Sequence, residues 1–243
     1  SAVIYPVSSQ HSCRKFDIPW SLFAGILVMF FALYTCPVKL QLGDFGHFDV
    51  RDGFISGIGG LAFLMCFLIF LIHSLMNAKK GETNIDEVVP KQMPVLRAVL
   101  CVLVGLCALV IGGDLIVKGA VKVATNLGVS DAVIGLTVVA LGTSLPELAT
   151  SCIAAFKHNS DLALGNVIGS NIFNIFLILG VTSVVSPLPV YAGLLLDASM
   201  VVLGSVLVWV FVSEKGHQIK RRHGAYLLLI YAVYLTYRLV MLP

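Results

Sequence analysis

The residues that could carry chemistry lie in one apolar stretch, ALGTSLPELAT, at positions 140–150. It contains the carboxylate of Glu147, with the hydroxyl residues Thr143 and Ser144 just upstream. Residues 143 and 147 are four apart, so both face the same way on a helix. An ionisable side chain inside a membrane costs about 2.5–3.5 kcal/mol, so such residues usually have a function. The alternative is a structural carboxylate paired to a base.

The proline in this stretch predicts an irregular backbone beside the carboxylate. On a continuous helix Pro146 cannot donate a hydrogen bond to the carbonyl of Gly142, and the kink also loosens the carbonyls of Ala140 and Thr143. Freed carbonyls, hydroxyls and a carboxylate are hard oxygen ligands, which suit Na⁺, Ca²⁺ or Mg²⁺ and not zinc or copper. The stretch is therefore a candidate cation site.

A second polar motif, GNVIGSNIFN, begins at Gly165. Asn166, Ser170 and Asn174 recur every four residues and form one stripe on a helix. Gly165 and Gly169 form a small-xxx-small pair that would let another helix approach closely. Taken alone, the motif also fits a packing interface with Asn and Ser as polar contacts between helices. Because this motif directly follows the kinked helix that carries Glu147, the two helices could face each other with an ion between them.

The composition indicates that a membrane must position these residues. Of 243 residues 58% are hydrophobic and 12% are charged, about half the charged fraction of a soluble domain. Stretches of about 20 apolar residues are long enough to span a bilayer as helices. We predict an all-α polytopic membrane protein with about seven spans: 19–36, 53–76, 95–117, 131–156, 162–185, 190–212 and 224–241.

The loop charges predict the orientation. Eleven of the sixteen Lys and Arg residues lie on one side of the predicted spans, and the side richer in these bases is usually cytoplasmic. The loop 77–94 is therefore expected inside and the C-terminus outside, in a plasma membrane that would be a bacterial inner membrane. The eleven are Arg14, Lys15, Lys79, Lys80, Lys91, Arg97, Lys157, Lys215, Lys220, Arg221 and Arg222.

An internal repeat predicts two halves of opposite orientation. SAVIYP at 1–6 resembles TSVVSP at 182–187, and each is followed by a span, a charged turn and another span. Residues 1–76 would then be the end of a first repeat, 77–94 a cytoplasmic linker loop, and 95–243 a second repeat of five spans. Three spans equivalent to those in 95–185 are expected ahead of Ser1. Inverted repeats of this kind are typical of transporters.

With these motifs the sequence resembles the calcium/cation antiporter superfamily, most closely its bacterial sodium/calcium exchanger branch. GTSLPE and GSNIFN lie in adjacent helices at the family's spacing, and the likeness is strongest over 105–187. The resemblance implies a ten-helix fold of two inverted five-helix repeats, with the ion sites between the signature motifs of the two repeats. By this resemblance the ion ligands are Glu147, Thr143, Ser144, Ala140, Ser170 and Asn174.

The resemblance also predicts what is missing. Several branches of the family have an aspartate at the position of Asn174, so this site would carry less negative charge. The first signature pair, with its own glutamate, is not in this chain. Ca²⁺ takes six to eight oxygen ligands, so we expect half a site, and no transport by the 243-residue chain alone.

The predicted function is a secondary antiporter that exchanges Na⁺ for Ca²⁺ by alternating access across the lipid bilayer. The alternatives are a Ca²⁺/H⁺ or other cation antiporter and a non-transporting membrane scaffold. A channel would need a filter segment, and none is visible. GxSxG, HExxH, Walker A and GxGxxG patterns do not occur, so neither an enzyme nor a prosthetic cofactor is expected. Asp197 could lie near an interface or on a proton path.

Overall fold

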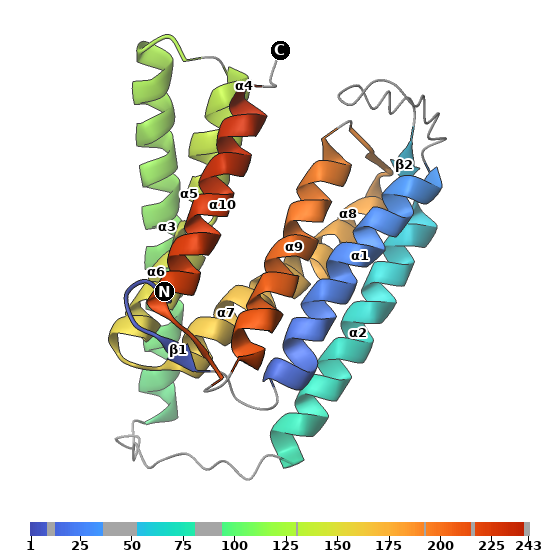
Figure 1. The fold of residues 1–243 in the computed structure, drawn as a ribbon. Coiled ribbons are helices and arrows are strands. Elements are labelled where there is room, and N and C mark those ends of the chain that lie inside the picture. The colour runs from blue at the N-terminus through green and yellow to red at the C-terminus, as the bar shows by residue number, and fades with distance from the viewer. Residues whose placement is uncertain are drawn as a thin grey trace.

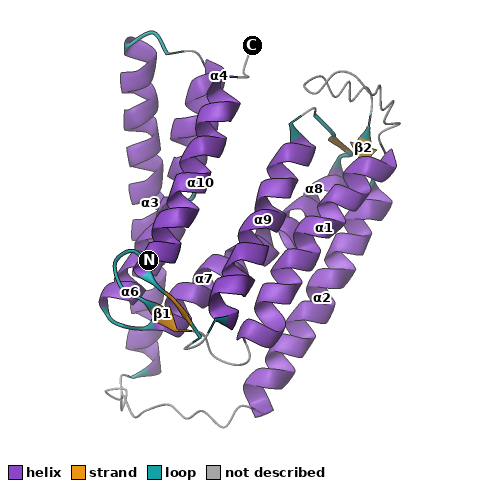
Figure 2. Cartoon of the chain, in the orientation of Figure 1, coloured by secondary structure: helices purple, strands orange, loops and turns teal. Residues whose placement is uncertain are grey.

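The structure is a computed structural model that describes residues 1–8, 13–35, 53–80, 94–129, 131–191, 193–214 and 217–240. Most of the predicted linker loop, residues 81–93, lies outside them. The described residues are predominantly helical, with four two-residue strands (Figure 2). The prediction of an all-α polytopic protein is confirmed.

Five helical segments are long and apolar enough to cross a membrane, and a bent pair of helices makes a sixth candidate. The five are 15–34, 57–77, 95–126, 160–185 and 194–213, and the bent pair covers 137–156. The last predicted span is the helix α10 (Arg221–Val240). It lies outside this set because four tyrosines and Arg238 make it less apolar, so a seventh span stays a prediction.

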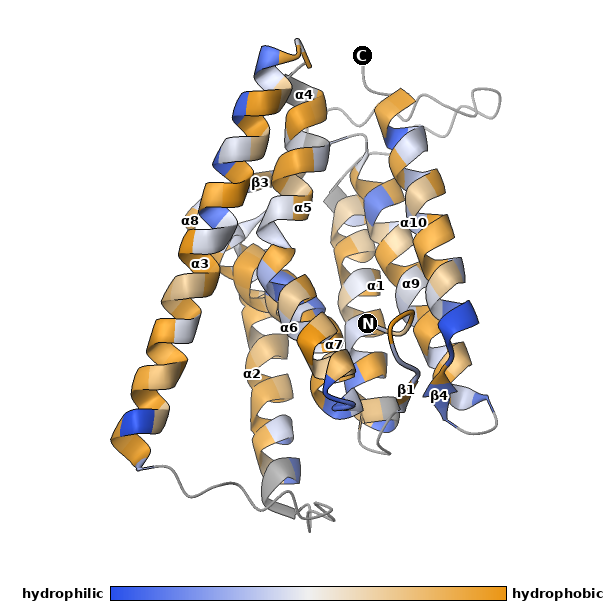
Figure 3. Cartoon of the chain, turned by 90° about the vertical axis from the view of Figure 1, so that its left-hand side faces the viewer, coloured by the Kyte–Doolittle hydropathy of each residue, from blue (hydrophilic) through white to orange (hydrophobic). Residues whose placement is uncertain are grey.

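The helices form two groups joined by α7 (Figure 1). α1 (Ile18–Thr35), α2 (Gly57–Lys80), α8 (Gly180–Val185) and α9 (Leu194–Ser213) form one group. The other group contains α3 (Val95–Asn126) and the kinked series α4 (Asp131–Ile134), α5 (Ala140–Thr143) and α6 (Leu145–Phe156). The helix α10 lies beside α9, away from α3, as Figure 3 shows, and its residues Tyr234 and Arg238 contact Asp197 of α9. The helix α7 (Ser160–Ile172) packs against α6 and against α1, so it contacts both groups.

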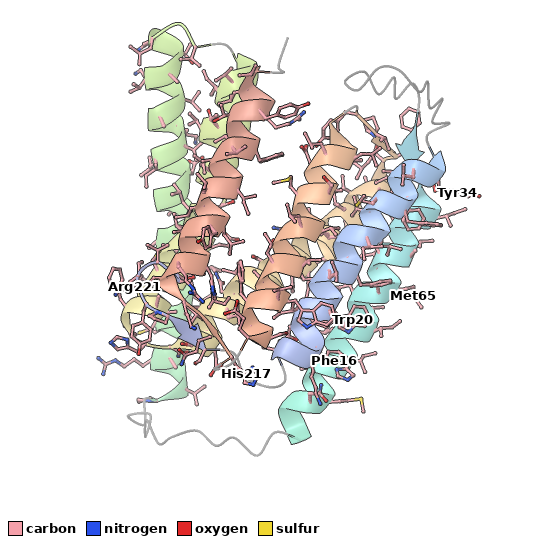
Figure 4. The ribbon with its side chains drawn as sticks, in the orientation of Figure 1. Phe16, Trp20, Tyr34, Met65, His217 and Arg221 are labelled. Carbon is pink, nitrogen blue, oxygen red and sulfur yellow. The ribbon has the colours of Figure 1, made fainter. Side chains whose placement is uncertain are left out.

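The core lies in the first group, where aromatic rings from three segments meet. Phe63 of α2 and Phe176 are fully buried. The ring of Trp20 on α1 lies 6.0 Å from that of Phe176 and 5.9 Å from that of Phe70. In Figure 4 Tyr34 and Met65 point away from the helices. Hydrophobic residues predominate along most of the helices in Figure 3, and many large apolar side chains, such as Phe30 and Leu61, are exposed, as expected for a chain solvated by lipid.

The helix α3 is longer than predicted, because the expected span ended at residue 117 and the helix continues to Asn126. Lys118 lies inside the helix, where lysine is a good helix former, and its ammonium lies 2.7 Å from the carboxylate of Asp114 one turn earlier. Two residues after the helix ends, Gly128 has a φ of 78°, a left-handed conformation that favours glycine and follows many helix ends. Within the described residues no side chain of α3 is buried.

Two short strand pairs connect the beginning of the chain with its later part. β1 (Val7–Ser8) pairs antiparallel with β4 (Gln218–Ile219), and β2 (Phe54–Ile55) pairs antiparallel with β3 (Leu188–Pro189). In Figure 1 the two pairs lie at opposite ends of the helices. Each pair therefore joins segments more than 130 residues apart at one end of the molecule.

Candidate cation site

The segment expected to kink is broken at the predicted place. The helices α4 (Asp131–Ile134) and α5 (Ala140–Thr143) flank a wide π-helical turn, η2 (Gly135–Val139). Ser144 separates α5 from α6 (Leu145–Phe156), and the axes of 137–143 and 145–156 differ by 52°. Because Pro146 lies in the first turn of α6, it needs no backbone donor there. The predicted kink is confirmed.

The break frees the carbonyl of Ala140 from the backbone hydrogen bonds of the helix. The N–H of Ser144 donates to Leu141, 3.1 Å away, instead of to Ala140. The hydroxyl of Thr143 donates to the Ala140 carbonyl at 3.0 Å, and the hydroxyl of Ser144 does so at 3.4 Å. Each hydroxyl directs its hydrogen at this carbonyl, so its oxygen lone pairs remain available. Thr143 and Ser144 are both exposed.

Glu147 lies in the first turn of α6 and is half-buried. Its Oε2 atom is buried and has no hydrogen-bond partner among the described residues. A buried carboxylate oxygen without a partner is costly, although the positive end of the α6 dipole favours a negative charge there. This oxygen is free to accept a cation.

The helix α7 holds the second polar motif beside α6. Asn159 caps it, its side chain accepting the N–H of Leu162 at 3.0 Å. Asn166 donates from Nδ2 to the carbonyl of Glu147 at 3.1 Å and to the hydroxyl of Ser151 at 2.9 Å. Two hydrogen bonds from one side chain therefore join α7 to the turn of α6 that carries the carboxylate.

Ser170 and Asn174 continue the same stripe away from Asn166. The hydroxyl of Ser170 donates to the Val167 carbonyl of its own helix at 3.1 Å. Asn174 is exposed and lies in a second π-helical segment, η3 (Phe173–Leu179). Residues 157–159 connect α6 to α7, so the two helices run in opposite directions. Ser170 and Asn174 follow Asn166 by about one and two helical turns, and among the described residues neither side chain makes a hydrogen bond to α5 or α6.

The glycine pair of α7 does not act as expected. A Cβ atom on Gly165 or Gly169 would meet nothing within 4 Å among the described residues, because α7 turns Asn166, not its glycines, toward α6. Close approach occurs instead at Gly142, where a Cβ atom would lie 2.0 Å from a methyl carbon of Val117 on α3. The prediction of close packing at the α7 glycines is therefore wrong for the described residues.

Ser151 is the polar residue at this site that the sequence analysis did not identify. It is 3% exposed and accepts a hydrogen bond from Asn166. A signal was present, because Ser151 is four residues after Glu147 and eight after Thr143, on the same helix face. Within the described residues no group of three His, Cys, Asp or Glu side chains could hold a metal ion. Of the six ligands that the sequence predicts, Glu147 is the one with a carboxylate.

The profile of the sodium/calcium exchanger protein family matches residues 97–240, more than half of the chain. The chain belongs to this family. It is 45% identical to sodium/calcium exchanger MaX1 of Methanosarcina acetivorans over 117 aligned residues, and this alignment covers 48% of this chain and 33% of MaX1. It is 35% identical to CaxA of Alkalimonas amylolytica over 207 residues, 82% of this chain and 65% of CaxA.

The solved structure of the sodium–calcium exchanger NCX_Mj, soaked with Na⁺ and Sr²⁺, has the same fold. The TM-score is 0.71 and the sequence identity 31%, over 97% of this chain and 69% of NCX_Mj. The chain thus spans 65% of CaxA and 33% of MaX1. As a member of the exchanger family with several apolar helices, the chain is a multi-pass membrane protein.

Proposed function

We propose that this chain supplies half of the ion-binding site of an antiporter that exchanges Na⁺ for Ca²⁺. The observation that carries the proposal is the buried, unpartnered oxygen of Glu147 on a kinked helix of an exchanger-family chain. The ligands would be Glu147 with the oxygens of Thr143, Ser144 and Ala140 from the kink, and those of Ser170 and Asn174 from α7 and η3.

The Ala140 carbonyl is the weakest member of this ligand set. Its oxygen already accepts hydrogen bonds from the hydroxyls of Thr143 and Ser144. It could bind a cation only after one of those hydroxyls rotates away and frees a lone pair. The two hydroxyl oxygens, whose hydrogens point at Ala140, are better placed as ligands.

The chain's own oxygens support half a site. Calcium takes six to eight oxygen ligands and favours carboxylates, whereas these residues offer one carboxylate and several neutral oxygens. The first signature pair of the family, with its own glutamate, would supply the remaining oxygen ligands. That pair is not in this sequence. With Asn174 instead of an aspartate the site would have less negative charge.

The strand pairs support the proposal of two inverted repeats. β1 and β3 follow the matching segments 1–6 and 182–187, while β2 and β4 directly precede the helices α2 and α10 of the matching spans. Each strand pairs with the non-equivalent strand of the other half. A pseudo-twofold axis that relates 1–76 to the later part of 95–243 would convert the β1–β4 pair into the β3–β2 pair. The two observed strand pairs are therefore the arrangement expected from such an axis.

The mechanism would be competition at one set of oxygens. Because Na⁺ and Ca²⁺ would bind overlapping ligands, full occupancy by one ion excludes the other. A protein that exposes this set to one side of the membrane at a time then exchanges the two ions, and an inward Na⁺ gradient drives Ca²⁺ out. The eleven-base side would face the cytoplasm, in the inner membrane if the cell is bacterial.

Flux measurements test the proposal. We would reconstitute the chain in vesicles, alone and fused behind the amino-terminal helices of NCX_Mj, and measure uptake of radioactive Ca²⁺ driven by an outward Na⁺ gradient. We expect uptake by the fusion, none by the chain alone, and at least a tenfold loss with Glu147→Gln. Glu214→Gln, which changes the same functional group at the far end of α9, is the control and should retain uptake.

Three results would overturn or change the proposal. Uptake by the fusion that is unchanged by Glu147→Gln would overturn the proposed site. Uptake that follows a proton gradient and ignores Na⁺ would replace Na⁺ with H⁺ as the exchanged ion. Robust uptake by the chain alone would show that its own residues, or a second copy, complete the site.

A further inference from the structure

We infer that Asn166 is a positioning residue that fixes the carboxylate helix α6 against the hydroxyl-bearing helix α7. The inference rests on the proposed function, because it concerns the geometry of that cation site. Asn166 need not touch the ion itself. Its two hydrogen bonds to Glu147 and Ser151 are what set the site's spacing.

The orientation of the Asn166 amide follows from its partners. The carbonyl of Glu147 can only accept a hydrogen bond, so the amide nitrogen and not the amide oxygen must face it. The same nitrogen carries a second hydrogen, which is given to the hydroxyl of Ser151 at 2.9 Å. Both N–H donors are thus used, and the reversed amide would place two acceptors 3.1 Å apart.

The bond to Glu147 is not needed to build α6. In an α-helix the carbonyl of residue 147 already accepts the N–H of residue 151, and the second lone pair is what Asn166 uses. The extra bond therefore links two helices and does not complete one. Since Ser151 is 3% exposed, the link lies out of water, where an amide donor is costly to leave unsatisfied.

The position of the link gives it its effect on the site. Asn166 donates a hydrogen bond to the backbone carbonyl of Glu147, the residue that carries the carboxylate. Ser170 lies one helical turn after Asn166 on α7. Moving or rotating α6 against α7 would change the distance from the Glu147 carboxylate to the Ser170 hydroxyl. Displacements of about 1 Å are enough to impair a coordination or catalytic geometry.

The test is a Ca²⁺ titration of the purified chain in detergent, read as the rise in melting temperature with CaCl₂. A ligand that binds only the folded chain stabilises it by RT ln(1 + [L]/Kd), so a fit of the melting temperature against CaCl₂ concentration gives the dissociation constant. We call this concentration, at which half of the sites are occupied, the midpoint. One carboxylate with a few neutral oxygens should give a midpoint of about millimolar. We expect Asn166→Ala to raise the midpoint about fivefold to tenfold, as for one or two lost hydrogen bonds.

Two further variants separate positioning from stability alone. Ser151→Ala keeps Asn166 and removes one of its two hydrogen-bond acceptors, so it should raise the midpoint by about twofold to threefold. Because it is the smaller change, it also provides the test if Asn166→Ala does not fold. Asn126→Ala, at the exposed end of α3, should leave the midpoint unchanged. In a Glu147→Gln background, Asn166→Ala should lower the melting temperature without any Ca²⁺ dependence to lose.

Each outcome decides the matter. If the unsubstituted chain does not respond to Ca²⁺, the proposed site fails and this inference fails with it. If the chain responds, and Asn166→Ala lowers the melting temperature but keeps the midpoint, then Asn166 only stabilises the helix pair and this inference alone is overturned. A raised midpoint for both Asn166→Ala and Ser151→Ala supports it.

Discussion

At the scale of single residues, one glycine determines how closely α3 approaches the kinked segment. Gly142 is buried in α5, and a Cβ atom added there would lie 2.0 Å from Cγ2 of Val117 and 3.3 Å from its Cβ. Valine is branched at Cβ and cannot easily rotate away. Gly142 is also next to Thr143, so a shift here would move a proposed ion ligand.

Gly142→Ala should therefore lower the stability of the chain. Forcing extra volume into such a contact costs about 1–3 kcal/mol, which we expect as a lower melting temperature in detergent. The matched control is Gly135→Ala in the same segment, where a Cβ atom meets nothing within 4 Å. This change should be neutral or stabilising by up to about 1 kcal/mol, because alanine loses less backbone entropy than glycine.

A second substitution checks the cause. Val117→Ala in the Gly142→Ala background removes the colliding methyl groups and should recover part of the lost melting temperature. Equal melting temperatures for Gly142→Ala and Gly135→Ala would contradict a close contact between Val117 and the backbone of α5.

At the scale of elements, α10 is joined to α9 through a polar cluster around Asp197. Its carboxylate accepts hydrogen bonds from the hydroxyl of Tyr191 and, at 2.7 Å, from that of Tyr234 on α10. Nε of Arg238 lies 3.3 Å from the same carboxylate as an ion pair. These contacts join α9 to α10, and the prediction that Asp197 lies near an interface or on a proton path stays a prediction.

Tyr234→Phe should weaken this connection. It removes one hydrogen bond to a charged group, a loss of about 1–2 kcal/mol at this partly exposed position. Tyr231→Phe, three residues earlier on α10, is the control and should change little, because among the described residues the hydroxyls that donate to Asp197 are those of Tyr191 and Tyr234. The measurement is the melting temperature of each variant in detergent; equal values for the two would contradict a linking role for Asp197.

At the scale of the whole molecule, the two strand pairs mark opposite sides of the proposed membrane protein. β2 and β3 lie at one end of the helices and β1 and β4 at the other (Figure 1). The loop charges predict that the β1–β4 end is cytoplasmic, because most of the lysines and arginines lie on that side. The β2–β3 end would then face outside.

Labelling of single cysteines tests this orientation. In a background without the six natural cysteines, we would place one cysteine by Phe54→Cys or by Gln218→Cys, both at exposed strand positions. A membrane-impermeant maleimide should label the cysteine at 54 in intact cells. It should label the one at 218 only after the membrane is opened. The reverse pattern would show that the loop charges mislead here.

Much of the fold could be predicted from the sequence, because a bilayer imposes simple rules. Apolar length predicted the helices, and α1, α2, α7 to α9 lie where the spans were expected. Local chemistry predicted the kink, since Pro146 acts on carbonyls within one turn of itself. The same rules placed the end of α3 too early, because apolar length stops at the first charged residue whereas the helix continues through Lys118 to Asn126.

The sequence by itself determined which residues could serve a cation site, because carboxylates, hydroxyls and a helix-breaking proline are properties of the residues themselves. The tertiary structure decided how the two motifs meet. Helical periodicity groups Asn166 with Ser170 but cannot say which face of α7 turns toward α6. That choice depends on packing between helices, and here the asparagine bonds to Glu147 and Ser151 while the neighbouring glycines turn away.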